Sequence, residues 1–184
     1  MGDVSAKRVS RAPGEPSPHQ EPTEIRRTLA RNLRQAREAA GLSQAALTKA
    51  ASCDRRQVRN IEVDAANTTL DTVARLAKAL GLTEIDLLLP NMENVTAQRL
   101  SLAPEEPLSK TEPTEFRRRF ARNLRQAREA AGLPQRVLAS AAALSLSRVW
   151  KIEVKAINVT LDTVTVLAKQ LGCTEIDLLR PKDP

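Results

Sequence analysis

The sequence predicts an all-α fold made of two tandem copies of one five-helix domain. The first observation is a repeat: residues 22–90 align without a gap onto residues 113–181, and 45 of the 69 aligned positions are identical. The second is that four of the six glycines fall in matched pairs after amphipathic runs, where helices commonly end. The third is that no segment alternates polar and apolar residues with the period of a strand.

The repeat divides the chain into five parts. The segments outside the two copies are rich in Pro, Ser and Glu, which predicts disordered tails and a flexible linker. In chain order, the parts are an N-terminal tail (1–21), a first domain (22–90, repeat 1), a linker (91–112), a second domain (113–181, repeat 2) and a C-terminal tail (182–184).

Five helices are expected in repeat 1. Ile25, Leu29 and Leu33 lie at helical spacing and predict the first helix, over 24–40. Good N-cap residues open the next three, over 44–51, 55–63 and 70–80: Ser43, Asp54 and Thr69. Thr83 and Asp86 form a capping-box-like start to a fifth, over 84–89. Repeat 2 should match, apart from Pro134 in place of the Ser43 cap.

Composition excludes several classes of protein. The net charge of +7 indicates an anionic partner such as nucleic acid or a membrane surface. No apolar run is long enough to span a membrane, and the first twenty residues lack the apolar region of a secretory signal. The two cysteines and the single histidine, His19, form no metal-ligand pattern, and no catalytic set appears. We therefore expect a cytoplasmic protein that is not an enzyme and needs no cofactor, metal or small-molecule ligand.

Residues 42–82 resemble the helix-turn-helix domain of phage repressors, the Cro/C1 type of XRE-like proteins. The motif residues are Leu42-Ser43-Gln44, Val58, Ile61, Glu62, Asn67 and Thr69-Leu70-Asp71. The resemblance covers each repeat from its first helix to its last and implies a lambda-repressor-like fold. It also implies an ion pair between the first and third helices, here Arg37 with Glu62 and Arg128 with Glu153. The sequence departs from the family at Asp64 and Lys155, where glycine is frequent.

The resemblance implies binding to double-stranded DNA, with the third helix in the major groove. Arginine can bond guanine through two atoms, and Asn or Gln can do the same with adenine. The candidate base-reading residues of repeat 1 are Gln44, Arg55, Arg56, Gln57, Arg59 and Asn60. Weaker candidates for phosphate contacts are Arg34, Lys49 and Arg75. The expected role is that of a transcriptional regulator, such as a repressor.

The two copies diverge sharply in this third helix. CDRRQVRN (53–60) aligns with LSLSRVWK (144–151), and only the valine is common to both. The weaker DNA-contact candidates of repeat 2 are Gln135, Ser145, Ser147, Arg148 and Lys151. Leu146 and Trp150 form an apolar pair, which is a candidate protein interface.

Two hypotheses remain open at this point. In the first, both domains bind one composite operator as a covalent pseudo-dimer. In the second, repeat 1 binds DNA while repeat 2 docks a protein, such as a toxin, a polymerase subunit or a second copy of the chain. An antitoxin or antiactivator is a special case of the second.

Overall fold

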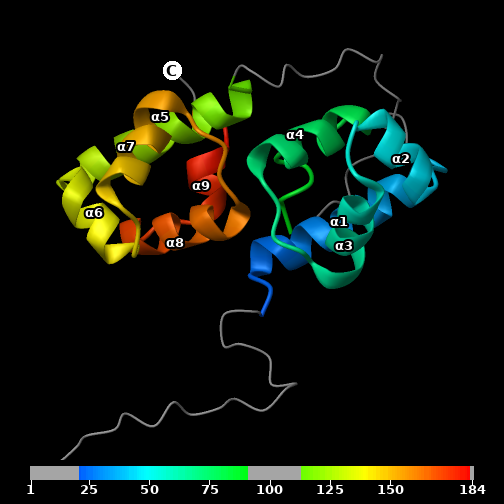
Figure 1. The fold of residues 1–184 in the computed structure, drawn as a ribbon, viewed down its shortest axis with the longest axis horizontal. Coiled ribbons are helices and arrows are strands. Elements are labelled where there is room, and N and C mark those ends of the chain that lie inside the picture. The colour runs from blue at the N-terminus through cyan, green and yellow to red at the C-terminus, as the bar shows by residue number, and fades with distance from the viewer. Residues whose placement is uncertain (1–20, 91–112, 183–184) are drawn as a thin grey trace, which may run out of the picture.

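The computed structural model describes residues 21–90 and 113–182. The predicted linker, nearly all of the predicted N-terminal tail and the last two residues lie outside this part of the chain. The described residues contain helices and no strands, which confirms the all-α prediction. Figure 1 shows the two repeats side by side, with α2 and α6 at opposite ends of the molecule.

The two repeats contribute nine helices to the described residues. Repeat 1 contains α1 (Glu24–Ala39), α2 (Gln44–Ala50), α3 (Arg55–Asp64) and α4 (Leu70–Ala79). Repeat 2 contains α5 (Glu115–Ala130), α6 (Gln135–Ala141), α7 (Leu146–Lys155), α8 (Leu161–Leu171) and α9 (Glu175–Leu179). The first four predicted helices of repeat 1 are confirmed to within a residue at each end.

Side-chain caps start the short helices of repeat 1. The hydroxyl of Ser43 accepts the backbone N–H of Ala46 at 3.1 Å. The carboxylate of Asp54 accepts the N–H of Arg56 at 2.7 Å. Each bond satisfies an amide that the first turn of a helix leaves without a partner. In repeat 2, Pro134 provides no such bond to α6.

The predicted fifth helix forms in repeat 2 only. In repeat 1, the cap bonds between Thr83 and Asp86 are present, but residues 84–88 form consecutive turns. The N–H of Leu89 still reaches the carbonyl of Ile85 at 2.9 Å. A segment of five residues has very few backbone bonds, so the loss of one decides between a helix and turns.

A buried asparagine fastens the last turn of each repeat to its first helix. Asn32 of α1 is 1% exposed and donates its side-chain amide to the carbonyls of Leu87 and Leu89, at 3.1 and 2.7 Å. Asn123 makes the same pair of bonds to Leu178 and Arg180, at 3.1 and 2.9 Å. Two carbonyls at the end of each repeat therefore have partners without water.

The two repeats pack directly against each other. Their buried apolar residues form one core cluster, which includes Phe116 and Phe120 at 1% exposure each. Thr69 and Thr160 form an antiparallel bridge between the repeats. The sequence predicted two domains joined only by a linker, so this direct contact is a feature that the structure adds.

Candidate nucleic-acid interface

Helices α2 and α3 are joined by a tight turn over residues 51–54. Ser52 adopts a φ of 49°, a left-handed conformation that costs a residue with a Cβ atom about 1 kcal/mol. Two backbone bonds hold the turn: Ser52 N–H to the Lys49 carbonyl at 3.1 Å, and Cys53 N–H to the Thr48 carbonyl at 3.0 Å. Repeat 2 has the same turn, with Ala143 at a φ of 52°. The result is a helix-turn-helix in each copy.

One face of α3 is buried and the opposite face is open to solvent. Val58 is fully buried and Ile61 is 1% exposed, so their face is packed into the core. Arg56, Arg59 and Asn60 are exposed on the other side of the helix. A helix packed in this way holds its backbone in place and presents a row of hydrogen-bonding side chains, which can reach base edges in a groove.

The other three base-reading candidates of repeat 1 are Gln44, Gln57 and Arg55, and the first two already have a hydrogen-bond partner within the protein. Gln44 donates its amide to Glu62 Oε2 at 2.7 Å. Gln57 donates its amide to the hydroxyl of Thr72, on α4, at 3.1 Å. Each bond occupies one of the two N–H donors of the amide and leaves the other donor and the carbonyl oxygen for a further partner. Arg55 begins α3, and its side chain lies outside the described part of the chain.

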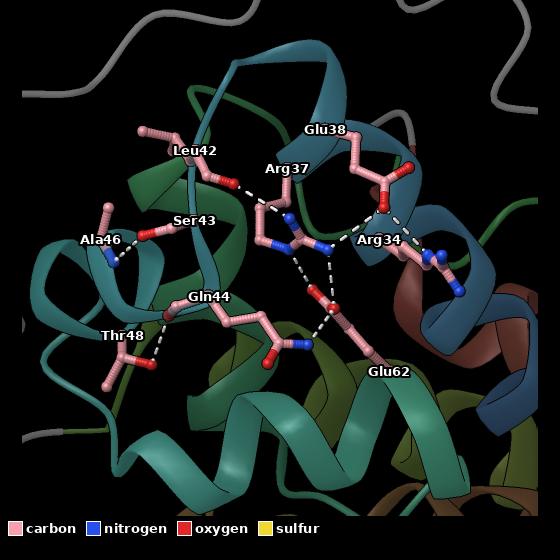
Figure 2. Close-up of polar contacts among 9 residues, drawn as sticks. All are labelled: Arg34, Arg37, Glu38, Leu42, Ser43, Gln44, Ala46, Thr48 and Glu62. Atoms are coloured by element: carbon pink, nitrogen blue, oxygen red, sulfur yellow. Dashed lines mark hydrogen bonds and ion pairs between the residues drawn. The ribbon is translucent and has the colours of Figure 1, made fainter.

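A buried ion pair positions α3 against α1 (Figure 2). Arg37 donates Nε to Glu62 Oε1 at 2.7 Å and Nη2 to Glu62 Oε2 at 3.0 Å. The two side chains are 11% and 2% exposed. A third bond, from Arg37 Nη1 to the Leu42 carbonyl at 2.9 Å, ties the pair to the start of α2. The bond to Glu62 raises the pKa of Arg37 above its usual value.

Repeat 2 contains the same network. Arg128 donates Nε to Glu153 Oε1 at 2.7 Å, and Gln135 donates to Glu153 Oε2 at 2.7 Å. The Arg128 and Glu153 side chains are 10% and 1% exposed. The ion-pair network of the motif is therefore the same in both copies, and Gln135 occupies the position of Gln44.

Arg75 fastens the turn to α4, a role that the sequence did not indicate. Its Nη1 donates to the Ser52 carbonyl at 3.1 Å, and its Nη2 donates to the Thr72 hydroxyl at 3.4 Å. Arg34 bonds Glu38 at 2.9 Å and thereby lowers the pKa of that carboxyl. Both arginines thus have protein partners. Lys49 is exposed near the end of α2.

The solvent-facing side of α7 is more apolar than that of α3. Leu146, Trp150 and Val154 lie four residues apart on the helix and are 49%, 42% and 52% exposed. Lys155 places its ammonium 5.8 Å from the centre of the Trp150 ring, within the range of a cation–π contact. We call the three apolar residues the α7 stripe.

The polar candidates of repeat 2 border the α7 stripe. Ser147, Arg148 and Lys151 are exposed. Ser145 is the N-cap of α7, because its hydroxyl accepts the N–H of Arg148 at 3.2 Å. Its hydroxyl therefore already takes part in one bond within the protein.

Among residues 21–90 and 113–182, no group of three or more potential ligands gathers at one point to hold a metal ion. Cys53 and Cys173 are partly buried against the core, and burial raises the pKa of each thiol. No helix in the described part of the chain is long and apolar enough to cross a membrane.

Two linked helix-turn-helix units, each with an ion-paired interior, define a protein of the helix-turn-helix class. A family model described as a helix-turn-helix domain matches residues 28–88 and again residues 119–180. Together these matches cover more than half of the chain, and the protein belongs to this family. No curated protein and no solved structure matches it at a significant level. Family membership supports DNA binding and confirms the resemblance drawn from the motif residues.

Proposed function

We propose that the protein is a sequence-specific regulator of transcription that binds double-stranded DNA, with α3 of repeat 1 in the major groove. The observation that carries this proposal is the exposed row of Arg56, Arg59 and Asn60 on a helix whose other face is buried. Arginine offers two donors to the O6 and N7 atoms of guanine, and asparagine pairs with N6 and N7 of adenine. The role needs no cofactor and no catalytic group.

Charge supports the same partner. The chain carries a net charge of +7, and contacts with phosphates release the counterions that surround DNA. Affinity that depends on such contacts falls steeply as salt concentration rises.

We place the protein in the cytoplasm, associated with the nucleoid when bound to DNA.

The packed repeats favour a composite operator over a single site. Because the contacts between repeats are reciprocal, α3 and α7 lie at equivalent positions about an approximate two-fold axis. Dimeric helix-turn-helix proteins use such an arrangement to place two reading helices on successive half-sites. Since α3 and α7 share few residues on their exposed sides, the two half-sites should differ in sequence.

A second candidate function rests on the α7 stripe. Leu146, Trp150 and Val154 leave apolar surface on the helix that corresponds to α3, and exposed Trp and Leu are frequent at protein interfaces. In this alternative, repeat 2 docks a protein partner while repeat 1 binds DNA, as in an antitoxin or an antiactivator.

Selection of bound sequences from a random DNA library, followed by footprinting of the full chain, tests the proposal. We expect one enriched sequence with two unlike half-sites, and binding that weakens as salt is raised. A single protected half-site would favour the second candidate. Binding without any sequence preference would contradict base reading by α3. Arg59→Ala should weaken this binding, and Arg125→Ala, at an exposed arginine of α5 that pairs with Glu129, is its control for loss of a single positive charge.

A further inference from the structure

The surface between the repeats is built from reciprocal contacts. Arg26 Nη1 lies 3.2 Å from Asp162 Oδ2, and Arg117 Nη1 lies 3.2 Å from Asp71 Oδ2. Arg117 and Asp162 are the residues that align with Arg26 and Asp71 in the repeat. Each repeat therefore contributes one arginine and one aspartate, and each residue meets the opposite charge from the other copy.

The backbone hydrogen bonds between the repeats are reciprocal as well. The N–H of Leu70 donates to the Val159 carbonyl at 3.0 Å, and the N–H of Leu161 donates to the Thr68 carbonyl at 2.9 Å. These bonds flank the antiparallel bridge between Thr69 and Thr160.

Side chains of one repeat also cap a helix of the other. The N–H of Asp71, in the first turn of α4, donates to Asn158 Oδ1 at 3.3 Å. The N–H of Asp162, in the first turn of α8, donates to Asn67 Oδ1 at 3.3 Å. The first amides of a helix have no acceptor within the helix, so an asparagine of each repeat supplies an acceptor for an N–H of the other repeat. Thr114 and Thr23 add hydroxyl bonds to Asp71 and Asp162, at 3.1 and 3.4 Å.

A reciprocal contact between two nearly identical surfaces has a particular consequence. Each repeat contains every member of the contact: the arginine, the aspartate, the asparagine and the threonine occur in both copies at aligned positions. An interface in which residue i meets j and j meets i is self-complementary. Arg26 can therefore meet Asp71 of a second chain with the geometry in which it meets Asp162 of its own.

We infer that this surface fits a second copy of the same repeat, so that two chains can pair repeat 1 with repeat 1 and repeat 2 with repeat 2. In a single chain, the covalent connection raises the effective concentration of the unlike repeat to roughly millimolar, which favours the internal pair. Pairing between chains becomes the stable state once the internal pair is weakened. Under the proposed function, this assembly would carry two copies of α3, but the pairing itself is measurable without DNA.

Reversal of the two charges of repeat 2 separates internal from external pairing. In Arg117→Asp with Asp162→Arg, Arg26 faces a second guanidinium and Asp71 faces a second carboxylate, so the internal pair is repelled. Two copies of repeat 1 keep their native charges, and two copies of repeat 2 remain complementary with the signs exchanged. We expect the mass in sedimentation velocity to move from one chain, 20.2 kDa, to two chains or more.

The matched control reverses all four charges. With Arg26→Asp and Asp71→Arg added, the unlike repeats attract again, and the protein should return to the mass of one chain. A folded double variant that keeps the mass of one chain would overturn the inference. Equal association of the fourfold variant would also overturn it, because the association would then not depend on charge matching.

A milder variant covers the case in which the double variant does not fold. Arg117 also donates Nε to the Ala156 carbonyl at 2.6 Å within its own repeat, and this bond is lost in Arg117→Asp. Asp162→Lys alone leaves that bond intact and repels Arg26. Because the new lysine would also face Arg117 in a pair of two repeats 2, only the pair of two repeats 1 keeps its native charges. We expect concentration-dependent dimers for Asp162→Lys and none for Glu129→Lys, which makes the same charge change at an exposed site late in α5. A folded Asp162→Lys protein that stays at one chain at every concentration would contradict the pairing of repeat 1 with repeat 1.

Discussion

Repeat 1 and repeat 2 share a buried arginine–glutamate pair with the same bonds, and their sequences differ most sharply on the outer face of one helix. The Arg37–Glu62 and Arg128–Glu153 pairs both have an Nε to Oε1 distance of 2.7 Å. On α3 the exposed positions carry Arg56, Arg59 and Asn60, whereas α7 exposes Leu146 and Trp150; an exposed valine, Val63 or Val154, is common to both helices. The fold depends on what is buried, so the exposed face can change its chemistry without loss of the scaffold. What a helix-turn-helix contacts is therefore decided by few residues.

The largest expected effect tests whether the two interiors are equivalent. Glu62→Ala and Glu153→Ala should each lower the free energy of unfolding by about 3–5 kcal/mol, because each leaves a buried guanidinium without its carboxylate. Urea denaturation followed by circular dichroism measures both. Glu38→Ala is the control, since Glu38 contacts the same Arg37 from an exposed position and its loss should cost far less stability. A large difference between Glu62→Ala and Glu153→Ala would show that the repeats are not equivalent.

The second prediction tests the difference between the outer faces. Arg59→Ala should weaken binding to the selected operator by about 1–3 kcal/mol and relax the preference at one base pair. Trp150 occupies the aligned position of repeat 2, and Trp150→Ala should alter the other half-site only. Gel-shift titration on operators with single base changes measures both effects. If Arg56→Ala and Arg59→Ala both bind the operator as tightly as the unaltered protein, α3 is not the helix that contacts the bases.

Much of the scaffold could be predicted from the sequence, because its signals are local. The spacing of Ile25, Leu29 and Leu33 and the caps Ser43 and Asp54 lie within a few residues of the helices that they specify. The fifth helix of repeat 1 was the exception, since its cap bonds form without a complete helix.

The contact between repeats could not be predicted in this way. Asp71 and Arg117 are 46 residues apart, and nothing in the helical periodicity of either segment indicates that they meet. The same limit applies to Gln57, whose amide bonds Thr72 on another helix. A signal was nonetheless available: Arg26, Asn67 and Asp71 are polar residues that recur unchanged in repeat 2.

The third prediction concerns a buried position at which the repeats differ. Thr68 is 3% exposed, and its Oγ1 is buried with no hydrogen-bond partner within the described residues. The aligned residue is Val159, which has a methyl group in place of the hydroxyl. Thr68→Val should therefore stabilise the protein by about 1–2 kcal/mol, and Val159→Thr should destabilise it by a similar amount. Urea denaturation of both variants measures the effect. Destabilisation by Thr68→Val would mean that the hydroxyl has a partner.

The smallest expected effect concerns the turn of each helix-turn-helix. Ser52 and Ala143 adopt φ values of 49° and 52°, and a residue with a Cβ atom is strained there. Ser52→Gly and Ala143→Gly should relieve this strain and stabilise the protein by about 0.5–1 kcal/mol each, after the greater freedom of glycine in the unfolded chain is subtracted. The two gains should be nearly equal, because the backbone bonds of the two turns match. Thermal and urea denaturation of each single variant measure them. Ala127→Gly is the control, since Ala127 lies inside α5, where glycine costs about 1 kcal/mol. A gain at one turn and a loss at the other would show that the turns, and not only the exposed faces, distinguish the two repeats.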